Sequence, residues 1–278
     1  MTPLVFTLIT LVISFGAGLL GALVGLGGGI IVVPALTLLL DIDIRYAIGA
    51  SVVAVIATSS GAAAAYVREH MTNLRVAMFL ELATTSGAIS GAFLAGVVGG
   101  RWLFVVFGLM LAYSGLASLR RLNEHEGGSV GRDRLADRLR LHGAFFDPLA
   151  GHAISYQVTH SVGGLAIMYV AGALSGLLGI GSGMLKVLAM DQVMRLPLKV
   201  STATSNFMIG VTAAASAGVY FARGDIDPFV AAPVAAGVLG GAVAGSRLLP
   251  RVQSRTVRII FTVVLLWVAA QMLVRGLR

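Results

Sequence analysis

Long apolar runs separated by short charged clusters dominate the pattern of hydrophobic and polar positions along this chain. A helix needs about 20 apolar residues to cross the roughly 30 Å hydrocarbon core of a bilayer. Runs of about that length predict spanning helices at 46–66, 74–98, 101–119, 198–221, 228–249 and 257–275. Two further runs, 3–40 and 161–190, are equally apolar but interrupted. The pattern predicts an all-α polytopic membrane protein.

Glycine-rich clusters interrupt these two runs, at 25–29 and at 179–183. As one helix, run 3–40 would be about 57 Å long, well beyond the thickness of a bilayer. Because glycine frees the backbone and adds no side-chain packing, each run predicts a broken helix, or a hairpin whose turn lies within the membrane. The first run has neither a basic leader nor a clear small-residue cleavage site, which favours a retained membrane segment over a signal peptide.

An internal repeat relates the two halves of the chain at an offset of 154 residues. Without a gap, the offset pairs Ser51 with Ser205, and it also pairs Thr58 with Thr212. The other matches are Gly25, Gly27 and Gly29 with Gly179, Gly181 and Gly183; Tyr66 with Tyr220; Gly87, Ala88 and Gly91 with Gly241, Ala242 and Gly245; Arg101 with Arg255; and Phe107 with Phe261. We therefore expect two four-helix-type repeats, each opening with its glycine-broken segment.

The repeats define the expected organisation of the chain. A first transmembrane repeat covers 1–119, a polar linker covers 120–155, and a second transmembrane repeat covers 156–278. Within the linker, Ser129 is the expected N-cap of a short amphipathic helix that carries Leu135 and Leu139 on one face. The small-residue ladders Ala83/Gly87/Gly91 and Gly237/Gly241/Gly245 predict close helix packing.

The distribution of arginine and lysine favours repeats of opposite orientation. If each broken segment returns to the side it started from, fourteen basic residues share the linker side and five lie opposite. The rule that cytoplasmic loops are rich in Arg and Lys prefers this split to the nearly even one that parallel repeats give. The five are Arg45, Arg101, Arg223, Arg275 and Arg278. We therefore predict inverted-topology repeats with the linker in the cytoplasm.

Composition agrees with this class and excludes others. Hydrophobic residues make up 57% of the chain and charged residues 12%, whereas a soluble domain has about 25% charged residues. An ordinary soluble enzyme, a disordered protein and a nucleic-acid binder are therefore excluded. The chain has no cysteine and a net charge of +8. Its five histidines show no metal-ligand spacing, and no catalytic constellation is recognisable, so we expect no metal, no cofactor and no enzymatic activity.

The glycine breaks are the first candidates for a binding site. Close helix packing alone explains glycines four residues apart. Alternatively, unwound backbone and the N-termini of half-helices bind an anion, because they present free N–H donors. Broken helices at corresponding places of two repeats point to a transporter site. The candidate residues are Gly27, Gly28 and Gly29 in the first repeat, and Gly181, Ser182 and Gly183 in the second.

Lys186 follows the second break by three residues within an apolar run. An ionisable side chain at membrane depth is costly and indicates a functional role, here facing an anion. The alternatives are that it extends to the membrane interface or pairs with Asp191. Its equivalent in the first repeat is Val32.

Two further sets of polar residues complete the prediction. Hydroxyl and amide groups at the start of a helix donate to sulfonate or carboxylate oxygens, although they also serve as helix caps. Glu81 lies in the apolar run 74–98, where it either takes up a proton during coupling or pairs with a nearby arginine. The hydroxyl and amide candidates are Ser51, Thr204, Ser205 and Asn206.

Three segments resemble the TauE/SafE family of sulfite and organosulfonate transporters, also called the toluenesulfonate uptake permease family. They are Gly25–Pro34 (GLGGGIIVVP), Ser175–Lys186 (SGLLGIGSGMLK) and Leu198–Gly210 (LKVSTATSNFMIG). The family's second motif usually has three consecutive glycines, and Val-Pro after the lysine. This chain departs from it at Ser182 and at Val187 and Leu188. The resemblance implies a transporter of small sulfur-containing anions in the inner membrane of a bacterium.

We therefore expect a multi-pass secondary transporter that moves sulfite or an organosulfonate by alternating access. No nucleotide motif is present, so a proton gradient, a sodium gradient or the substrate's own gradient would supply the energy. The alternatives are a passive anion channel, a carrier for another small organic anion such as a carboxylate, and a scaffold that moves no solute. The expected partners are the anion and the lipid bilayer; no nucleic acid is expected, and the oligomeric state stays open.

Overall fold

The computed structural model describes residues 2–24, 28–68, 72–120, 133–147, 152–248 and 254–277. Each predicted uninterrupted run coincides with a helix to within three residues at either end. The elements in chain order are α1 Pro3–Val24, α2 Gly29–Leu39, α3 Ile44–Arg68, α4 Leu74–Val97, α5 Gly100–Arg120, α6 Arg134–Arg138, β1 Gly143–Asp147, β2 His152–Tyr156, α7 Ser161–Leu178, α8 Gly183–Leu188, the π-helical turn η1 Ala189–Val193, α9 Leu198–Arg223, α10 Pro228–Leu248 and α11 Ser254–Leu277.

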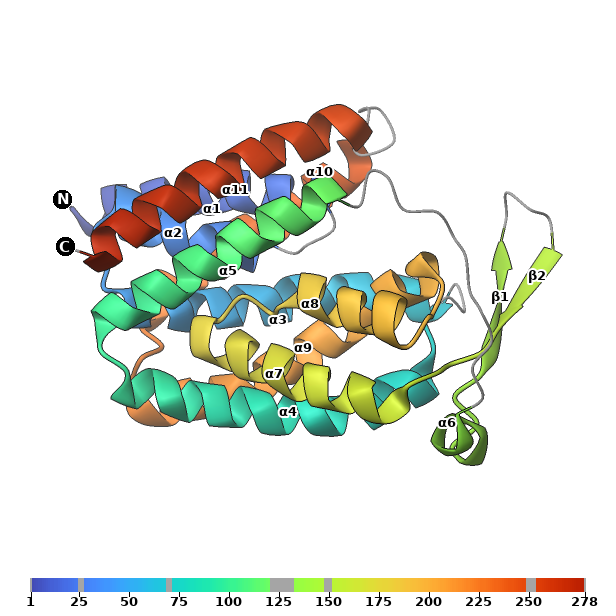
Figure 1. Cartoon of the computed structure of the whole chain (residues 1–278). Helices are drawn as coiled ribbons and strands as arrows, with labels where there is room; N and C mark the ends of the chain where they lie inside the picture. Colours follow the sequence, from blue (N-terminus) through green and yellow to red (C-terminus); the bar gives the residue numbers. More distant parts are fainter. Residues whose placement is uncertain are drawn as a thin grey trace.

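The helices form one bundle, with α11 and α5 along one side, α4 and α7 along the other, and α3 and α9 between them (Figure 1). The closest pairs are α1 with α10, α4 with α7, α5 with α11, and α3 with α9. Four described helices are long and apolar enough to cross a bilayer: they contain 3–21, 74–97, 161–178 and 228–245. The chain is therefore a multi-pass helical membrane protein.

Both long runs are broken at their glycine clusters. In the first half α1 ends at Val24 and α2 begins at Gly29, and in the second half α7 ends at Leu178 and α8 begins at Gly183. The two short segments also end alike, because Asp41 and Arg195, which are 154 positions apart, both have left-handed backbone conformations. Next to them, the N–H of Ile42 donates to Leu36 O, and the N–H of Leu196 donates to Met190 O.

Glycines let two pairs of helices approach at backbone distance. A Cβ added to Gly91 of α4 would lie 2.0 Å from Ala173 O of α7, and one added to Gly176 of α7 would lie 1.9 Å from Ala88 O of α4. On the other side of the bundle, a Cβ at Gly241 of α10 would lie 2.0 Å from Phe15 O of α1. Without a hydrophobic driving force between helices in lipid, such close packing stabilises their association. The predicted small-residue ladders are confirmed as packing faces at Gly87, Gly91, Gly237 and Gly241.

The part of the linker that the structure describes contains more structure than the sequence predicted. The short helix α6 is capped by Asp133, whose carboxylate accepts from the N–H groups of Leu135 and Ala136, while Ser129, the expected cap, lies outside the described residues. Strands β1 and β2 then form an antiparallel hairpin that pairs Phe145 with Ile154. The hairpin was not predicted, because two five-residue strands in a polar stretch give only a short apolar alternation.

Asp133 also connects the linker to the membrane helices. Its other carboxylate oxygen accepts from the N–H of Ser161, the first residue of α7, at 2.6 Å. Burial raises the pKa of Asp133, but the hydrogen bonds from Ser161, Leu135 and Ala136 lower it more, so that the pKa lies below its ordinary value. The carboxylate therefore stays charged at neutral pH and holds the start of α7 beside α6.

We expect Gly176→Ala to destabilise the protein by about 1–3 kcal/mol, because the added methyl group would overlap a backbone carbonyl that cannot move independently of α4. Gly218→Ala is the matched control, since a Cβ at Gly218 of α9 meets nothing within 4 Å. Thermal unfolding of the two purified variants in detergent measures the difference. Equal melting temperatures would contradict the role of close α4–α7 packing.

Candidate functional site

The two glycine breaks, which the chain separates by about half its length, meet at Ser51 of α3. The Ser51 hydroxyl lies 2.8 Å from Gly179 O, in the second break, and 3.2 Å from Gly29 O, at the first, and it donates to these carbonyls. Ser51 is fully buried. One hydroxyl of the first repeat thus satisfies Gly179 O, a carbonyl that the end of α7 leaves without an intrahelical partner, and also contacts the first carbonyl of α2.

The equivalent serine of the second repeat makes the equivalent contact. Ser205 of α9 is buried, and its hydroxyl donates to Gly183 O at 3.2 Å, the same separation that Ser51 has from Gly29 O. Since Ser205 and Gly183 lie 154 positions after Ser51 and Gly29, the two short helices are anchored to the following long helix in the same way.

The backbone of the second break requires left-handed conformations. Gly179, Gly181 and Ser182 have φ values of 65°, 71° and 40°. Glycine adopts such angles readily, whereas a residue with a side chain is strained by about 1–2 kcal/mol. Ser182 offsets part of that strain, because its hydroxyl donates to Ala171 O of α7 at 2.6 Å. The second break is therefore a turn of left-handed residues that the Ser182 hydroxyl ties to α7.

Lys186 lies one turn into α8 and is completely buried, with 0% of its surface exposed. Its ammonium donates to the hydroxyl oxygen of Thr212 on α9 at 2.6 Å. That hydroxyl lies 2.7 Å from Oε1 of Glu81 on α4. Lys186 does not extend to the membrane interface, and the threonine connects it to a carboxylate from the other repeat.

The two carboxylate oxygens of Glu81 have different surroundings. Its Oε1 accepts from the hydroxyl of Thr85 at 3.1 Å as well as from Thr212. Its Oε2 is buried and has no hydrogen-bond partner among the described residues. A buried carboxylate oxygen without a donor is costly, so the site has one vacant position for a proton or for another hydrogen-bond donor.

The remaining predicted residues lie around this centre but differ in surroundings. Thr204 is buried at the start of α9 and accepts from the backbone N–H of Asn73, at the N-terminus of α4, at 3.1 Å. Asn206 is partly buried. Gly28 caps α2 and is packed against Val238 of α10. Gly27 lies outside the described residues.

Thr212 and Thr85 are the polar residues of this centre that the sequence reasoning did not select as site residues. Thr212 had a usable signal, because it matches Thr58 at the repeat offset inside an apolar helix. Thr85 had none beyond its position one helical turn after Glu81. The structure brings Glu81 and Lys186 together from distant helices, which no spacing along the chain reveals.

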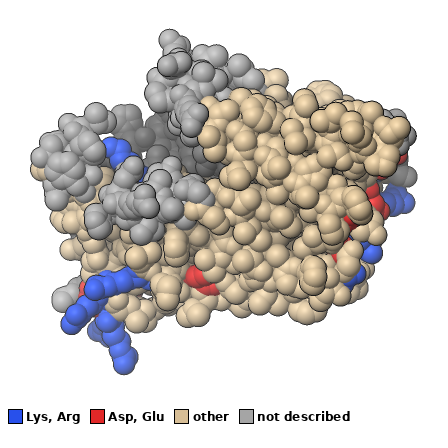
Figure 2. Space-filling view, turned by 180° about the vertical axis from the view of Figure 1, so that it is seen from behind, with Lys and Arg blue, Asp and Glu red and all other residues tan. Residues whose placement is uncertain are grey.

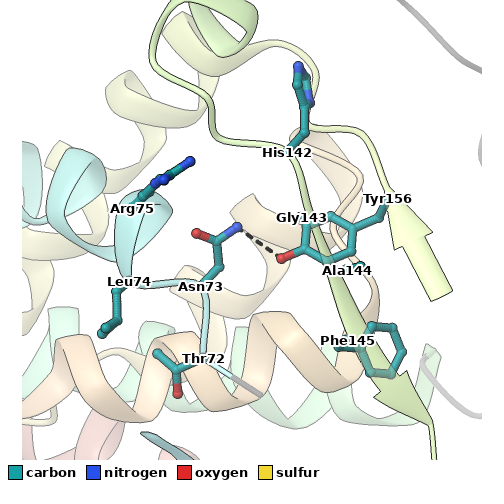
Figure 3. Close-up of a pocket in the computed structure, with 9 residues that line it drawn as sticks. All are labelled: Thr72, Asn73, Leu74, Arg75, His142, Gly143, Ala144, Phe145 and Tyr156. Carbon is teal, nitrogen blue, oxygen red and sulfur yellow. Dashed lines mark hydrogen bonds between the residues drawn. The ribbon is translucent and has the colours of Figure 1, made fainter. Parts of the chain in front are cut away.

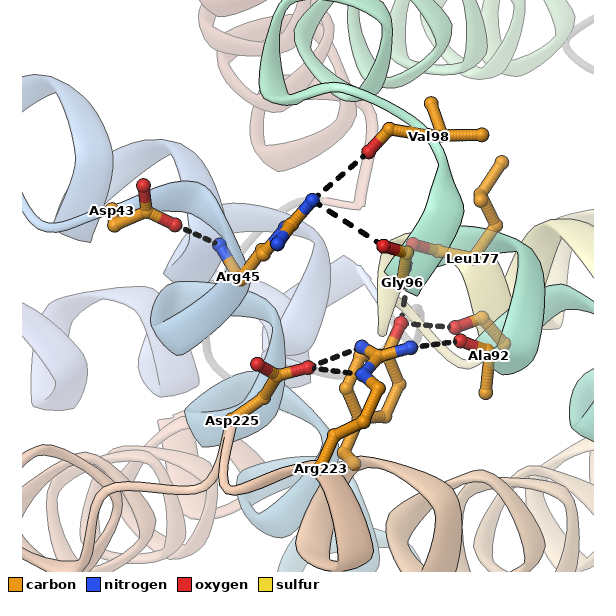
Figure 4. A network of polar contacts seen from close by, with 10 residues as sticks. Asp43, Arg45, Ala92, Gly96, Val98, Leu177, Arg223 and Asp225 are labelled. Atoms are coloured by element: carbon orange, nitrogen blue, oxygen red, sulfur yellow. Dashed lines mark hydrogen bonds and ion pairs between the residues drawn. The ribbon is translucent and has the colours of Figure 1, made fainter.

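A second polar network closes the bundle at the end away from the linker (Figure 4). Arg223, at the end of α9, pairs with Asp225 and donates to Ala92 O of α4 at 2.5 Å. Arg45, at the start of α3, donates to Val98 O at 3.3 Å. The buried Tyr220 hydroxyl donates to Gly176 O of α7 at 2.5 Å. These contacts tie the ends of four helices together and leave the Lys186 centre between this network and the linker.

A pocket opens at the linker end, between the start of α4 and the hairpin (Figure 3). Asn73 donates there to Leu141 O and to the Tyr156 hydroxyl, both at 2.9 Å. Arg75 and His142 line the same pocket. Asn73 therefore contacts the hairpin with its side chain and Thr204 with its backbone.

Charged side chains gather at the two ends of the molecule, and an uncharged belt covers most of the face between them (Figure 2). This distribution is typical of a protein whose belt faces lipid and whose ends face water and headgroups. Among the described residues, no three His, Asp or Glu side chains lie close enough together to hold a metal ion.

Comparison with known proteins identifies the family. The model of the sulfite exporter TauE/SafE family matches residues 10–272, nearly the whole chain. The chain belongs to the TauE/SafE family. Its curated relatives include the probable membrane transporter protein YunE of Bacillus subtilis, 28% identical over 97% of this chain and 98% of that protein. A probable membrane transporter protein of Xylella fastidiosa (strain 9a5c) is also 28% identical, over 84% of each chain. No solved structure matches.

Family membership indicates what kind of role the buried residues can have. The TauE/SafE relatives are named as membrane transporters, which supports a transport role and not an enzymatic one. The centre of buried Ser51, Ser205, Lys186 and Thr212 with the partly buried Glu81 lies where the two broken helices meet the long helices α3, α4 and α9. It is the candidate site.

We expect Ser51→Ala to destabilise this TauE/SafE protein by about 1–3 kcal/mol, because it removes the donor of the buried Gly179 O and a contact to Gly29 O. Ser205→Ala removes a contact to one carbonyl and should cost less. Thermal unfolding in detergent compares the two variants. If Ser205→Ala were the more damaging change, the bridge between the breaks would not be the principal role of Ser51.

Proposed function

We propose that this protein is a secondary transporter that binds a small anion at Lys186 and moves it by alternating access. The observation that carries the proposal is the complete burial of the Lys186 ammonium one turn after the second glycine break. A buried cation is costly unless an anion compensates it, and Thr212, its hydrogen-bond partner, is neutral. An anion entering at the break would find this charge together with the N–H groups that begin α8.

The family name favours a sulfur-containing oxyanion as the substrate. Sulfite and sulfonates present several acceptor oxygens around one charge, and the buried Ser182 and Ser205 hydroxyls lie on the segments next to Lys186. A carboxylate has fewer acceptor oxygens for the same charge. We therefore rank sulfite and organosulfonates ahead of carboxylates.

Alternating access fits an arrangement of two inverted repeats. The helix bounds support it, because α3, α4 and α5 begin at residues 44, 74 and 100, while α9, α10 and α11 begin 154 positions later at 198, 228 and 254. The pairing of α1 with α10 mirrors that of α4 with α7. Two such halves can rock against each other around a fixed central site.

The orientation follows from the basic residues. The inverted arrangement gives the linker side fourteen basic residues, Arg75 and Arg140 among them, and the opposite side five, among them Arg45, Arg223 and Arg275. Since basic residues concentrate on the cytoplasmic side, we place the linker in the cytoplasm and the protein in the inner membrane of a bacterium.

Lys186→Met should weaken binding of the preferred anion at least about tenfold, because a charge-assisted hydrogen bond is lost. The screen uses purified protein in detergent with sulfite, thiosulfate, taurine, sulfoacetate and simple carboxylates. Lys199→Met, the removal of the other lysine of the chain, is the control and should cause no comparable loss. Unchanged binding in Lys186→Met would contradict the anchoring role.

Counterflow in proteoliposomes separates a carrier from a channel. Unlabelled anion inside the vesicles should accelerate uptake of labelled anion, because a carrier returns faster when it is loaded. A channel lacks this trans-stimulation, and a scaffold gives no flux with either Lys186 or its variant. Measurable flux without trans-stimulation would show that the protein is a channel and not a carrier.

Single cysteines test the inverted arrangement directly, because the natural chain contains none. Arg101→Cys, near the C-terminus of α11, and Arg247→Cys, near the end of α10, should react with an impermeant thiol reagent from opposite sides of the membrane. The cysteine at 247 should react only from the cytoplasm, the side of the linker. Labelling of both from one side would refute the inverted topology.

A further inference from the structure

We propose that Glu81 is the proton-binding group of this transporter, and that its protonation accompanies anion binding at Lys186 through the shared hydroxyl of Thr212. The inference rests on the proposed function and specifies its energy source as cotransport of a proton with the anion.

The Thr212 hydroxyl has one hydrogen and two acceptors within reach. Glu81 Oε1 lies 2.7 Å from it and Met208 O lies 2.8 Å from it, while Lys186 donates to its lone pair. When Glu81 is ionised, the hydrogen is attracted to the carboxylate, because hydrogen bonds to charged acceptors are the stronger ones. When Glu81 is neutral, that preference falls and the hydrogen turns to Met208 O. The direction of the Thr212 hydroxyl, which accepts from Lys186, therefore depends on the charge of Glu81.

Charge balance gives the coupling its direction. Lys186 and an ionised Glu81 compensate each other across Thr212, so the empty site is neutral. Adding an anion alone would leave one uncompensated negative charge in a region of low dielectric constant, which is strongly unfavourable. Adding a proton together with the anion restores neutrality, with the anion taking over from Glu81 as the counter-ion of Lys186.

The proton has a place to bind. Oε2 of Glu81 is buried without a hydrogen-bond partner, whereas Oε1 accepts from Thr85 and Thr212. Protonation forms an O–H bond at Oε2 and converts the carboxylate to a neutral carboxyl group. The hydrogen bond from Thr85 can remain, whereas the one from Thr212 weakens. No covalent bond of the protein breaks, and the proton comes from water on whichever side the site is open.

The groups facing Glu81 leave Lys186 as its principal charged neighbour. Helix α7, which packs along α4, carries no Asp, Glu, Lys, Arg or His, and its Tyr169 donates to Ser90, more than two turns from Glu81. On α9, the charged Lys199 and Arg223 lie three or more turns from Thr212 near its ends. On α4 itself, Arg75 donates to Arg140 O in the linker. Asp191, on η1 after α8, has an interaction of its own.

The equivalent place in the other half of the bundle has no charge. The positions that correspond to Lys186 and Glu81 at the repeat offset are Val32 and Ala235, while Thr58 corresponds to Thr212. The Thr58 hydroxyl donates to carbonyls of its own helix, Ala54 O and Val55 O. Of these two equivalent places, only the one in the second repeat pairs a lysine with a glutamate, which predicts one proton for each transported anion.

The test uses proteoliposomes containing a pH-sensitive dye and methanesulfonate as the probe, because its charge does not change between mildly acidic and mildly alkaline conditions. A methanesulfonate gradient should move protons in the same direction as the anion. The apparent Kd of methanesulfonate for the protein, measured in detergent, should rise with pH by up to about tenfold per pH unit, which is the limit for one linked proton.

Glu81→Gln mimics the protonated group. It should bind methanesulfonate with a Kd independent of pH and lose proton movement. Thr212→Val should weaken the pH dependence, and Thr212→Ser, which retains the hydroxyl, should restore it. Thr58→Val is the matched control, because it removes the equivalent hydroxyl of the first repeat, and it should leave proton coupling intact.

The outcomes separate this inference from the function on which it depends. Methanesulfonate binding and counterflow without proton movement in the natural protein would overturn proton coupling while leaving the transporter, and this measurement needs no variant that must fold. Dependence on sodium in place of protons would overturn it as well. Absence of both binding and counterflow would overturn the proposed anion site and the coupling together.

Discussion

The buried Lys186 ammonium is the constraint on which the centre of this protein depends. A cation within a membrane protein must be compensated, and here the hydroxyl of Thr212 connects Lys186 to the carboxylate of Glu81 from the other repeat. This arrangement holds α8, α9 and α4 at one point. The attraction between the two charges is also weaker than in a direct ion pair, because a neutral hydroxyl group lies between them. A third partner with negative charge can therefore compete for the lysine.

The glycine breaks make that centre possible. At the end of α7 the second break leaves carbonyl groups that a continuous helix would satisfy internally, and hydrocarbon offers them no replacement donor. Ser51 donates to one of them, Gly179 O, and Ser51 and Ser205 also donate to the first carbonyls of α2 and α8. The irregular backbone is thus tolerated because it is buried in protein, and the same burial positions the start of α8 beside Lys186.

Packing and charge set the limits within which the halves can move. Backbone contacts at Gly91, Gly176 and Gly241 fix α4 to α7 and α10 to α1, so each of these pairs behaves as a rigid unit. At the end away from the linker, Arg223 and Arg45 donate to carbonyls at the end of α4. At the linker end, Asn73 joins α4 to α9 and to the hairpin. These two sets of polar contacts hold α4 near both of its ends.

The sequence by itself determined the helices, their breaks and the family. Hydrophobic run length and glycine content are local properties, and the thickness of the bilayer sets how long a spanning run must be. It also identified Lys186 and Glu81 separately, since each is a charge in an apolar run. It did not show that Thr212 joins them, that Ser51 bridges the two breaks, or that the linker contains a hairpin. Those features depend on contacts between residues from about 10 to more than 130 positions apart, and only the packing of α3, α4, α7 and α9 decides which distant side chains come within hydrogen-bond distance.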